Sequence, residues 1–104
     1  MAEQEWRIRL GLYGLGSNEP GTGNPVTLHL VLDASKRLLK VELEQSNQKA
    51  ERLEVRQRHL NRMKEITDIT ELQYEAQRVS KAAFASALYE QLDAEIELER
   101  EKAR

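Results

Sequence analysis

The stretch VTLHLVLDASKRLLKVELEQ, residues 26–45, decides the fold class that the sequence predicts. In residues 26–32, large apolar residues occupy every second position. The alternating apolar positions are Val26, Leu28, Leu30 and Leu32. This period is typical of a β-strand with one buried face. We therefore predict a strand over residues 26–32.

The second part of this stretch, residues 38–45, supports two interpretations. Its apolar residues alternate with lysine and glutamate, which favours a strand joined to the first by a hairpin connection over residues 33–37. The alternative is a helix capped by Asp33 or Ser35, because Leu39, Leu43 and Ala50 also fall near one helical stripe. The strand is the preferred interpretation, and the alternative leaves a sheet of two strands.

A further strand is predicted closer to the N-terminus. Residues 6–12 alternate in the same way, with apolar side chains at Trp6, Ile8, Leu10 and Leu12. Residues 14–25, GLGSNEPGTGNP, are dense in residues that favour turns. Their glycines match neither the dinucleotide fingerprint nor the nucleotide-binding loop, so we expect a connection between strands and not a phosphate site.

Two long helices are predicted after the sheet. Residues 46–66 contain no glycine or proline and are rich in helix-favouring residues. Thr70 and Gln73 have the spacing of a capping box, so a second helix is expected to begin there and to continue to the chain end. Small residues at positions 82, 83 and 85–87 would let another helix approach closely. The apolar stripe expected to form the interaction helix is Leu72, Ala76, Val79, Ala83, Ala87, Leu88 and Leu92.

These elements predict an α+β fold with one domain over residues 1–104. A short antiparallel sheet of two or three strands, a β-meander over residues 1–45 with the glycine-rich loop at 14–25, comes first. Two long α-helices forming a helical hairpin follow over residues 46–104 and end in a charged C-terminal tail. A domain of this size buries only about two thirds of its unfolded surface, so we expect a modest core that a partner completes.

The composition indicates a soluble chain. Charged residues make up 33% of the sequence and aromatic residues 5%, and the net charge is −2. A chain without cysteine has no disulfide or thiolate metal site, and we expect it in the cytoplasm. The first six residues include Glu3 and Glu5 and no apolar run, so no secretory signal is expected. No run of about 18 apolar residues predicts a membrane span, and no membrane partner is expected.

One segment carries a local excess of positive charge. Between Lys49 and Glu65, six basic residues stand against three acidic ones. The residues that could contact a polyanion are Arg52, Arg56, Arg58, Arg62 and Lys64. The C-terminal residues 90–104 carry the opposite balance, with six acidic and three basic residues. Pairing between the basic helix and the acidic tail is therefore the preferred interpretation, ahead of nucleic-acid binding.

The sequence contains no recognisable catalytic or metal-binding pattern. His29 and His59 are the two histidines, and neither has the neighbours of a metal site. The serines lack the nucleophile-elbow pattern, and the acidic residues lie on predicted helix surfaces. We therefore expect no enzyme activity, no catalytic or metal-binding residues and no cofactor.

The function that these observations favour is that of a non-catalytic protein-interaction module. It would be an adaptor, an assembly factor or a structural component that forms a homo-oligomer or docks a protein partner through its helices, in the manner of a coiled coil. A second hypothesis is a small nucleic-acid-binding regulator that uses the basic face of the first helix. A third is a small subunit of a larger complex or viral particle.

Overall fold

The computed structural model describes residues 25–104, and this part of the chain is built from three α-helices. They are α2, Pro25–Glu44; α3, Lys49–Glu75; and α4, Lys81–Ala103. Helix makes up 87% of the described part, and no strand occurs within it. The fold there is all-α, so the predicted α+β class is wrong. The strand predicted at 6–12 and, apart from Pro25, the loop predicted at 14–25 lie outside the described residues.

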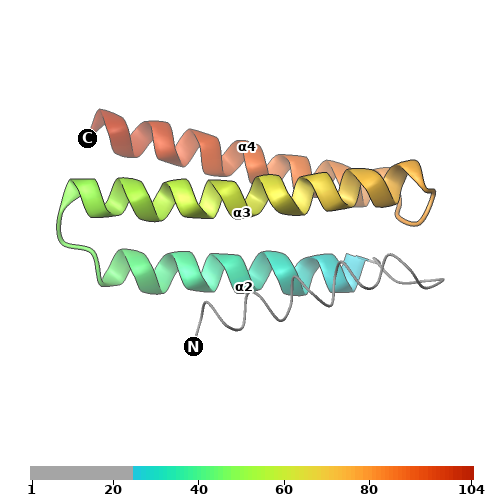
Figure 1. Cartoon of the computed structure of the whole chain (residues 1–104), viewed down its shortest axis with the longest axis horizontal. Helices are drawn as coiled ribbons and strands as arrows, with labels where there is room; N and C mark the ends of the chain where they lie inside the picture. The colour runs from blue at the N-terminus through green and yellow to red at the C-terminus, as the bar shows by residue number, and fades with distance from the viewer. Residues whose placement is uncertain (1–24) are drawn as a thin grey trace.

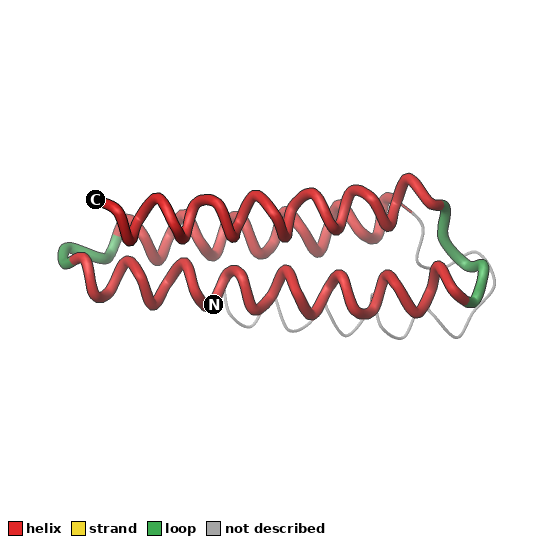
Figure 2. Tube along the Cα trace, turned by 90° about the horizontal axis from the view of Figure 1, so that it is seen from above, coloured by secondary structure: helices red, strands yellow, loops and turns green. Residues whose placement is uncertain are grey.

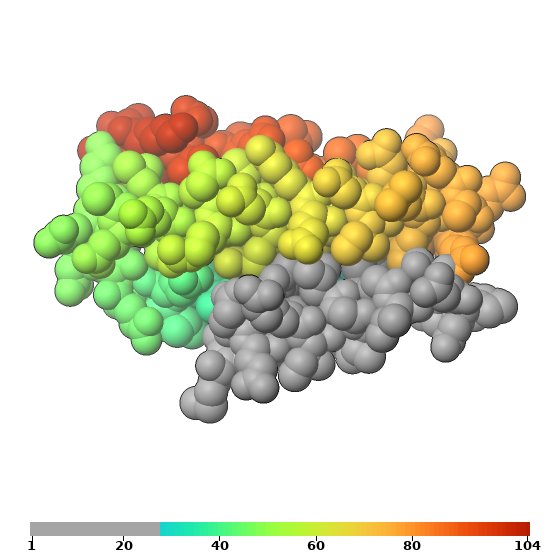
Figure 3. Space-filling view, in the orientation of Figure 1, coloured from blue at the N-terminus to red at the C-terminus, as the bar shows by residue number. Residues whose placement is uncertain are grey.

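The three helices lie side by side in an antiparallel order. α3 returns along α2, and α4 returns along α3, so α2 and α4 point in the same direction (Figures 1 and 2). An ion pair between Lys36 of α2 and Glu90 of α4, with 2.9 Å between Nζ and Oε1, links the two outer helices. In the space-filling view, α3 crosses the front and the C-terminal end of α4 lies along the upper edge (Figure 3).

The strands predicted at 26–32 and 38–45 are both part of α2. From Leu28 on, the buried positions of this helix follow a period of three to four residues, and they are Leu28, Val31, Leu32, Ala34, Ser35 and Leu38. Alternation predicted that Leu30 is buried and Val31 is not, whereas Leu30 is 45% exposed and Val31 is 1% exposed. Residues 33–37 contain no glycine or proline that would break a helix, and α2 runs through them without interruption. Residues 38–44 are helical, as the alternative interpretation has them, but Asp33 and Ser35 lie inside α2 and cap no helix.

The helix break predicted at residues 67–70 is also wrong. α3 continues for nine residues beyond Ile66, and the hydroxyls of its two buried threonines bond back into the helix. Thr67 Oγ1 donates to the Met63 carbonyl at 2.9 Å, and Thr70 Oγ1 donates to the Ile66 carbonyl at 2.7 Å. A threonine that satisfies its hydroxyl on the preceding turn does not cap a new helix.

The true connection between α3 and α4 lies at residues 76–80. Gln77 has a positive φ of 61°, and its N–H bonds the Tyr74 carbonyl at 2.9 Å. The Arg78 N–H bonds the Gln73 carbonyl at 2.8 Å, which completes a Schellman motif. α4 begins after the N-cap Ser80, whose side chain accepts from the Ala83 N–H at 3.1 Å. The chain therefore stops α3 without a glycine and starts α4 with a serine cap.

The core lies along the two seams that α3 makes with its neighbours. α2 contributes leucine and valine side chains, α3 contributes Leu60, Met63 and Ile66, and α4 contributes mainly alanines. Ala87 is 1% exposed, and its carbonyl oxygen lies 3.3 Å from Thr67 Oγ1 across the α3–α4 seam, where it shares the hydroxyl proton with the Met63 carbonyl. Small side chains thus let α4 lie close to α3.

Candidate interaction surface

α4 is apolar on two opposite faces. Its inner face carries Ala83, Ala87, Ala94 and Leu98, which are buried in the core. Its outer stripe consists of Leu88, Tyr89, Leu92 and Ile96, which are 39%, 68%, 55% and 50% exposed. Residues 88, 92 and 96 are four apart, so they share one helical face. The outer stripe therefore lies on the side of α4 opposite its buried face.

The seven residues predicted as one interaction stripe do not form one. Ala83 and Ala87 are buried within the chain, and Leu88 and Leu92 belong to the outer stripe. The remaining residues lie elsewhere: Leu72 is 66% exposed on α3, and Ala76 and Val79 are in the α3–α4 connection. The break at residues 76–80 shifts the helical phase, and for this reason one continuous stripe was a wrong expectation.

Sequence reasoning also missed two members of the outer stripe. Tyr89 and Ile96 were not in the predicted set, although Tyr89 is the most exposed of the four side chains. The signal was the spacing of Tyr89, Leu92 and Ile96 at three and four residues, which is the spacing of a helix-pairing seam. The buried alanines recur on the same helix at similar intervals. The sequence therefore did not show which apolar positions belong to the outer stripe and which to the buried face.

The five residues predicted to contact a polyanion do not form a free basic face. Arg52 and Arg56 both bond Glu101 Oε1, at 3.2 and 2.9 Å. The other arginines face α2: Arg58 pairs with Glu42, and the Nε of Arg62, which is buried, donates to Ser35 Oγ at 2.9 Å. Lys64 is exposed on α3. The positive charge of α3 is thus largely used to hold the neighbouring helices.

Glu101 is the acidic residue through which the end of α4 binds α3. Its side chain is buried, and besides Arg52 and Arg56 it lies 3.6 Å from Arg104 Nη1. The hydrogen bond from Arg56 holds the pKa of Glu101 below its ordinary value, against the opposing effect of burial, and Arg52 adds to the lowering. The expected pairing of a basic helix with an acidic tail is present at this residue.

A buried polar cluster joins α2 to α3. Arg62 Nε donates to Ser35 Oγ at 2.9 Å, and Ser35 Oγ and His59 Nδ1 are joined by a second hydrogen bond of 2.9 Å. Burial above all, and then the charges of Arg62, Lys36 and Arg56, lower the pKa of His59 from 6.5 to about 4.

This Ser–His pair is closed to a substrate. The Ser35 side chain is 0% exposed and His59 is 7% exposed, so no reacting group can reach the hydroxyl from solvent. Among the described residues, no group of histidine and acidic side chains could hold a metal ion. The cluster therefore satisfies polar atoms inside a helix seam.

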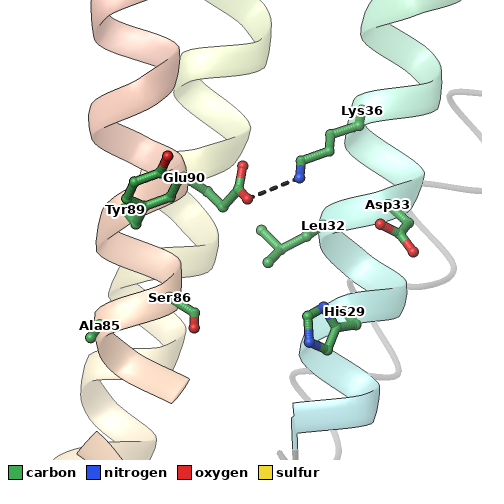
Figure 4. A pocket seen from close by; sticks show the side chains of 8 residues that line it. All are labelled: His29, Leu32, Asp33, Lys36, Ala85, Ser86, Tyr89 and Glu90. Carbon is green, nitrogen blue, oxygen red and sulfur yellow. Dashed lines mark hydrogen bonds and ion pairs between the residues drawn. The ribbon is translucent and has the colours of Figure 1, made fainter. Parts of the chain in front are cut away.

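A groove separates α2 from α4 beside the outer stripe (Figure 4). Its volume is about 430 Å³. It is lined by His29, Leu32, Asp33 and Lys36 of α2 and by Ala85, Ser86, Tyr89 and Glu90 of α4. Glu90 points across the groove to Lys36, and their ion pair spans it (Figure 4). Tyr89 belongs both to this groove and to the outer stripe, so the two features share an edge.

Comparisons with protein-family models, with curated proteins and with solved structures find no match for this chain. None of the described helices combines the length and the apolar character that a membrane span requires. The surface chemistry of the three helices is therefore the basis for a functional proposal.

Proposed function

We propose that this chain is a non-catalytic protein-interaction module, an adaptor, assembly factor or structural component that self-associates or docks a partner through α4. The observation that supports the proposal is the outer stripe of α4, where four large apolar side chains are 39–68% exposed on the face opposite the core. Contiguous apolar patches on a helix are typical of protein-binding surfaces. The proposal places the module in the cytoplasm, a compartment that suits a chain without cysteine.

The energetics of burial support this assignment. Burying a fully exposed leucine or isoleucine side chain is worth about 1.5–3 kcal/mol. A side chain that is half exposed can still contribute a part of this free energy when a partner covers it. Leu88, Leu92 and Ile96 lie on consecutive turns of one helix, so a single partner helix could cover all three. A scattered set of exposed residues would not offer this advantage.

The alternatives find less support in the geometry. A nucleic-acid-binding surface on α3 needs free cations, whereas Arg52, Arg56 and Arg58 are paired with carboxylates of α2 and α4. A catalytic role for Ser35 and His59 needs access, and both side chains are buried. The outer stripe combines exposure with a regular arrangement of chemically similar groups.

Site-specific photo-cross-linking tests the proposal. The photoreactive residue p-benzoylphenylalanine is placed at Leu92, in the outer stripe, and as a control at Lys64, an exposed position on α3. In cells that express the chain, we expect a discrete protein adduct on irradiation of the Leu92 variant and none from the control. Identical product patterns at both positions, or no product at Leu92, would contradict the proposal.

A further inference from the structure

The outer face of α4 has a large half and a small half. Along this face the exposed positions are Ala82, Ala85, Tyr89, Leu92, Ile96 and Glu99, spaced alternately by three and four residues. This spacing is that of the seam between two paired helices. The two alanines lie toward the start of α4, and the two aliphatic side chains lie toward its end. A second helix of the same sequence, running in the opposite direction, would place small residues opposite large ones.

The charges of α4 have a matching asymmetry. Residues 81–89 contain no acidic residue and begin with Lys81, whereas residues 90–104 contain six acidic and three basic residues. The start of a helix also carries the positive end of the helix dipole. One half of α4 is therefore electropositive and the other is electronegative.

We infer that the occupant of the outer face is a second copy of this chain, bound antiparallel about a two-fold axis near residue 90 of α4. Ala85 then faces Ile96 of the second copy, and Tyr89 faces Leu92 of the second copy. Lys81 lies beside Glu99 of the second copy, whose side chain is 70% exposed and pairs with its own Lys102 at 3.1 Å. This inference rests on the proposed function and names its partner.

The sizes of the side chains along α4 and the charges of its two halves both favour an antiparallel pair of α4 helices. A two-fold interface is self-complementary, so each half of the patch must match the other half. In a parallel pair, Ala85 would face Ala85 and leave a gap, and the acidic halves would lie together and repel. In the antiparallel pair, the acidic half of each copy covers the acid-free half of the other, and the helix dipoles oppose each other.

The size of the seam sets the expected strength of the dimer. From Ala82 to Glu99 the outer face is roughly 25 Å long and one helix wide, about 10 Å. Its footprint is well below the ~800 Å² per partner of a standard stable interface. We therefore expect a reversible dimer that forms over about micromolar to submillimolar concentrations, and the measurements must cover this range.

Charge reversal with sedimentation equilibrium at low salt tests the arrangement. Lys81→Glu and Glu99→Lys each create two repulsive contacts in their own dimer, and each is expected to weaken dimerisation about tenfold. When the two variants are mixed, every Lys81–Glu99 contact becomes attractive again, so a mixed dimer should form about as tightly as the original. Lys64→Glu, at an exposed position on α3, is the matched control and should not change the dimer.

The outcomes separate this inference from the proposed function. A chain that stays monomeric up to about 1 mM, or a mixture that associates no more tightly than its components, overturns the antiparallel dimer. In the photo-cross-linking experiment, the dimer predicts an adduct with twice the chain mass of 12.0 kDa. An adduct of any other mass overturns the dimer and leaves the proposed function standing. Circular dichroism of each variant confirms that the exposed substitutions leave the helices intact.

Discussion

At the scale of single residues, the α3–α4 seam depends on alanines that are almost completely buried. Ala83 is 5% exposed and Ala87 is 1% exposed, and the Ala87 carbonyl also receives the Thr67 hydroxyl. Protein interiors are packed so densely that one added methylene group is felt. The side chains of these alanines therefore set the distance between the two helices.

Replacing Ala87 with leucine should destabilise the chain. The added atoms have no room at a 1% exposed position, so we expect a loss of about 1–3 kcal/mol in the free energy of unfolding. Urea denaturation followed by circular dichroism measures this loss. The matched control is Ala50→Leu, at an exposed position in α3, which should stay within about 0.5 kcal/mol of the original. Equal effects of both substitutions would contradict close packing of Ala87 against α3.

His59 should make the stability depend on pH in a defined window. Its pKa in the folded chain, about 4, is below the value of 6.5, so the unfolded chain binds a proton at higher pH. The part of the free energy of unfolding that depends on neutral His59 is therefore fully present above pH 6.5. It decreases as the pH falls from 6.5 to about 4, and it is lost below about pH 4. Between pH 7.5 and 4.5 we expect a loss of about 2–3 kcal/mol in the free energy of unfolding.

The His59→Gln variant identifies the source of this pH dependence. Glutamine does not titrate, so the slope between pH 7.5 and 4.5 should largely disappear from its denaturation curves. Measurements above pH 4.5 stay clear of most of the titration of Glu101, whose pKa is lowered in the folded chain. An unchanged slope in the variant would show that another group causes the pH dependence.

At the scale of elements, the helix ends are set by local hydrogen bonds more than by residue type. α3 ends in a Schellman motif with Gln77 at the left-handed position, where glycine is the usual residue. α4 starts at Ser80, a common N-cap residue, and Tyr74 stacks on Phe84 with 5.4 Å between ring centroids, across the connection. These contacts define where the chain reverses.

Two substitutions in the connection should change stability in opposite directions. Gln77→Gly removes the steric cost of a positive φ and should stabilise the chain by about 0.5–1 kcal/mol. Ser80→Ala removes the acceptor for the Ala83 N–H and should destabilise it by about 1 kcal/mol, whereas Ser80→Asp should preserve most of the cap. Thermal unfolding of the three variants measures these effects. A stabilising Ser80→Ala would contradict the assigned cap.

At the scale of the whole molecule, α3 holds both neighbouring helices with polar contacts as well as apolar ones. Toward α2 it uses His59, Arg58 and Arg62. Toward the end of α4 it uses Arg52 and Arg56, which bond Glu101. Lys49 at the start of α3 also donates to the Lys102 and Arg104 carbonyls, both at 3.0 Å. The charged C-terminal segment is thereby part of the fold.

Removing the Glu101 carboxylate should free the end of α4. In Glu101→Gln, Arg52 and Arg56 lose their ionic partner, and we expect amide hydrogen exchange in the last two turns of α4 to become at least about tenfold faster. Exchange in the first turns of α4, held by the Ser80 cap, should remain unchanged. Because the pKa of Glu101 is lowered, the same local opening should appear in the original chain as the pH falls below the usual carboxyl range. Uniform exchange along α4 would contradict this role.

The sequence by itself determined the helical character of residues 49–66, the chain's charge distribution and the pairing of basic α3 with acidic Glu101. Each of these depends on local composition: helix-favouring residues without glycine or proline, and opposite charges on segments that follow each other. Local composition acts within a few residues, so it can be interpreted without knowing what lies across the seam.

Tertiary packing alone decided the remaining features. In residues 26–45, leucines at alternate positions suit a strand face, but packing against α3 selected Val31, Ala34 and Ser35 for burial and left Leu30 outside. The two apolar faces of α4 likewise could not be told apart until one was seen against α3. Periodicity shows only that a face is apolar. Which face is buried depends on the free energy gained from a neighbour that is distant in sequence.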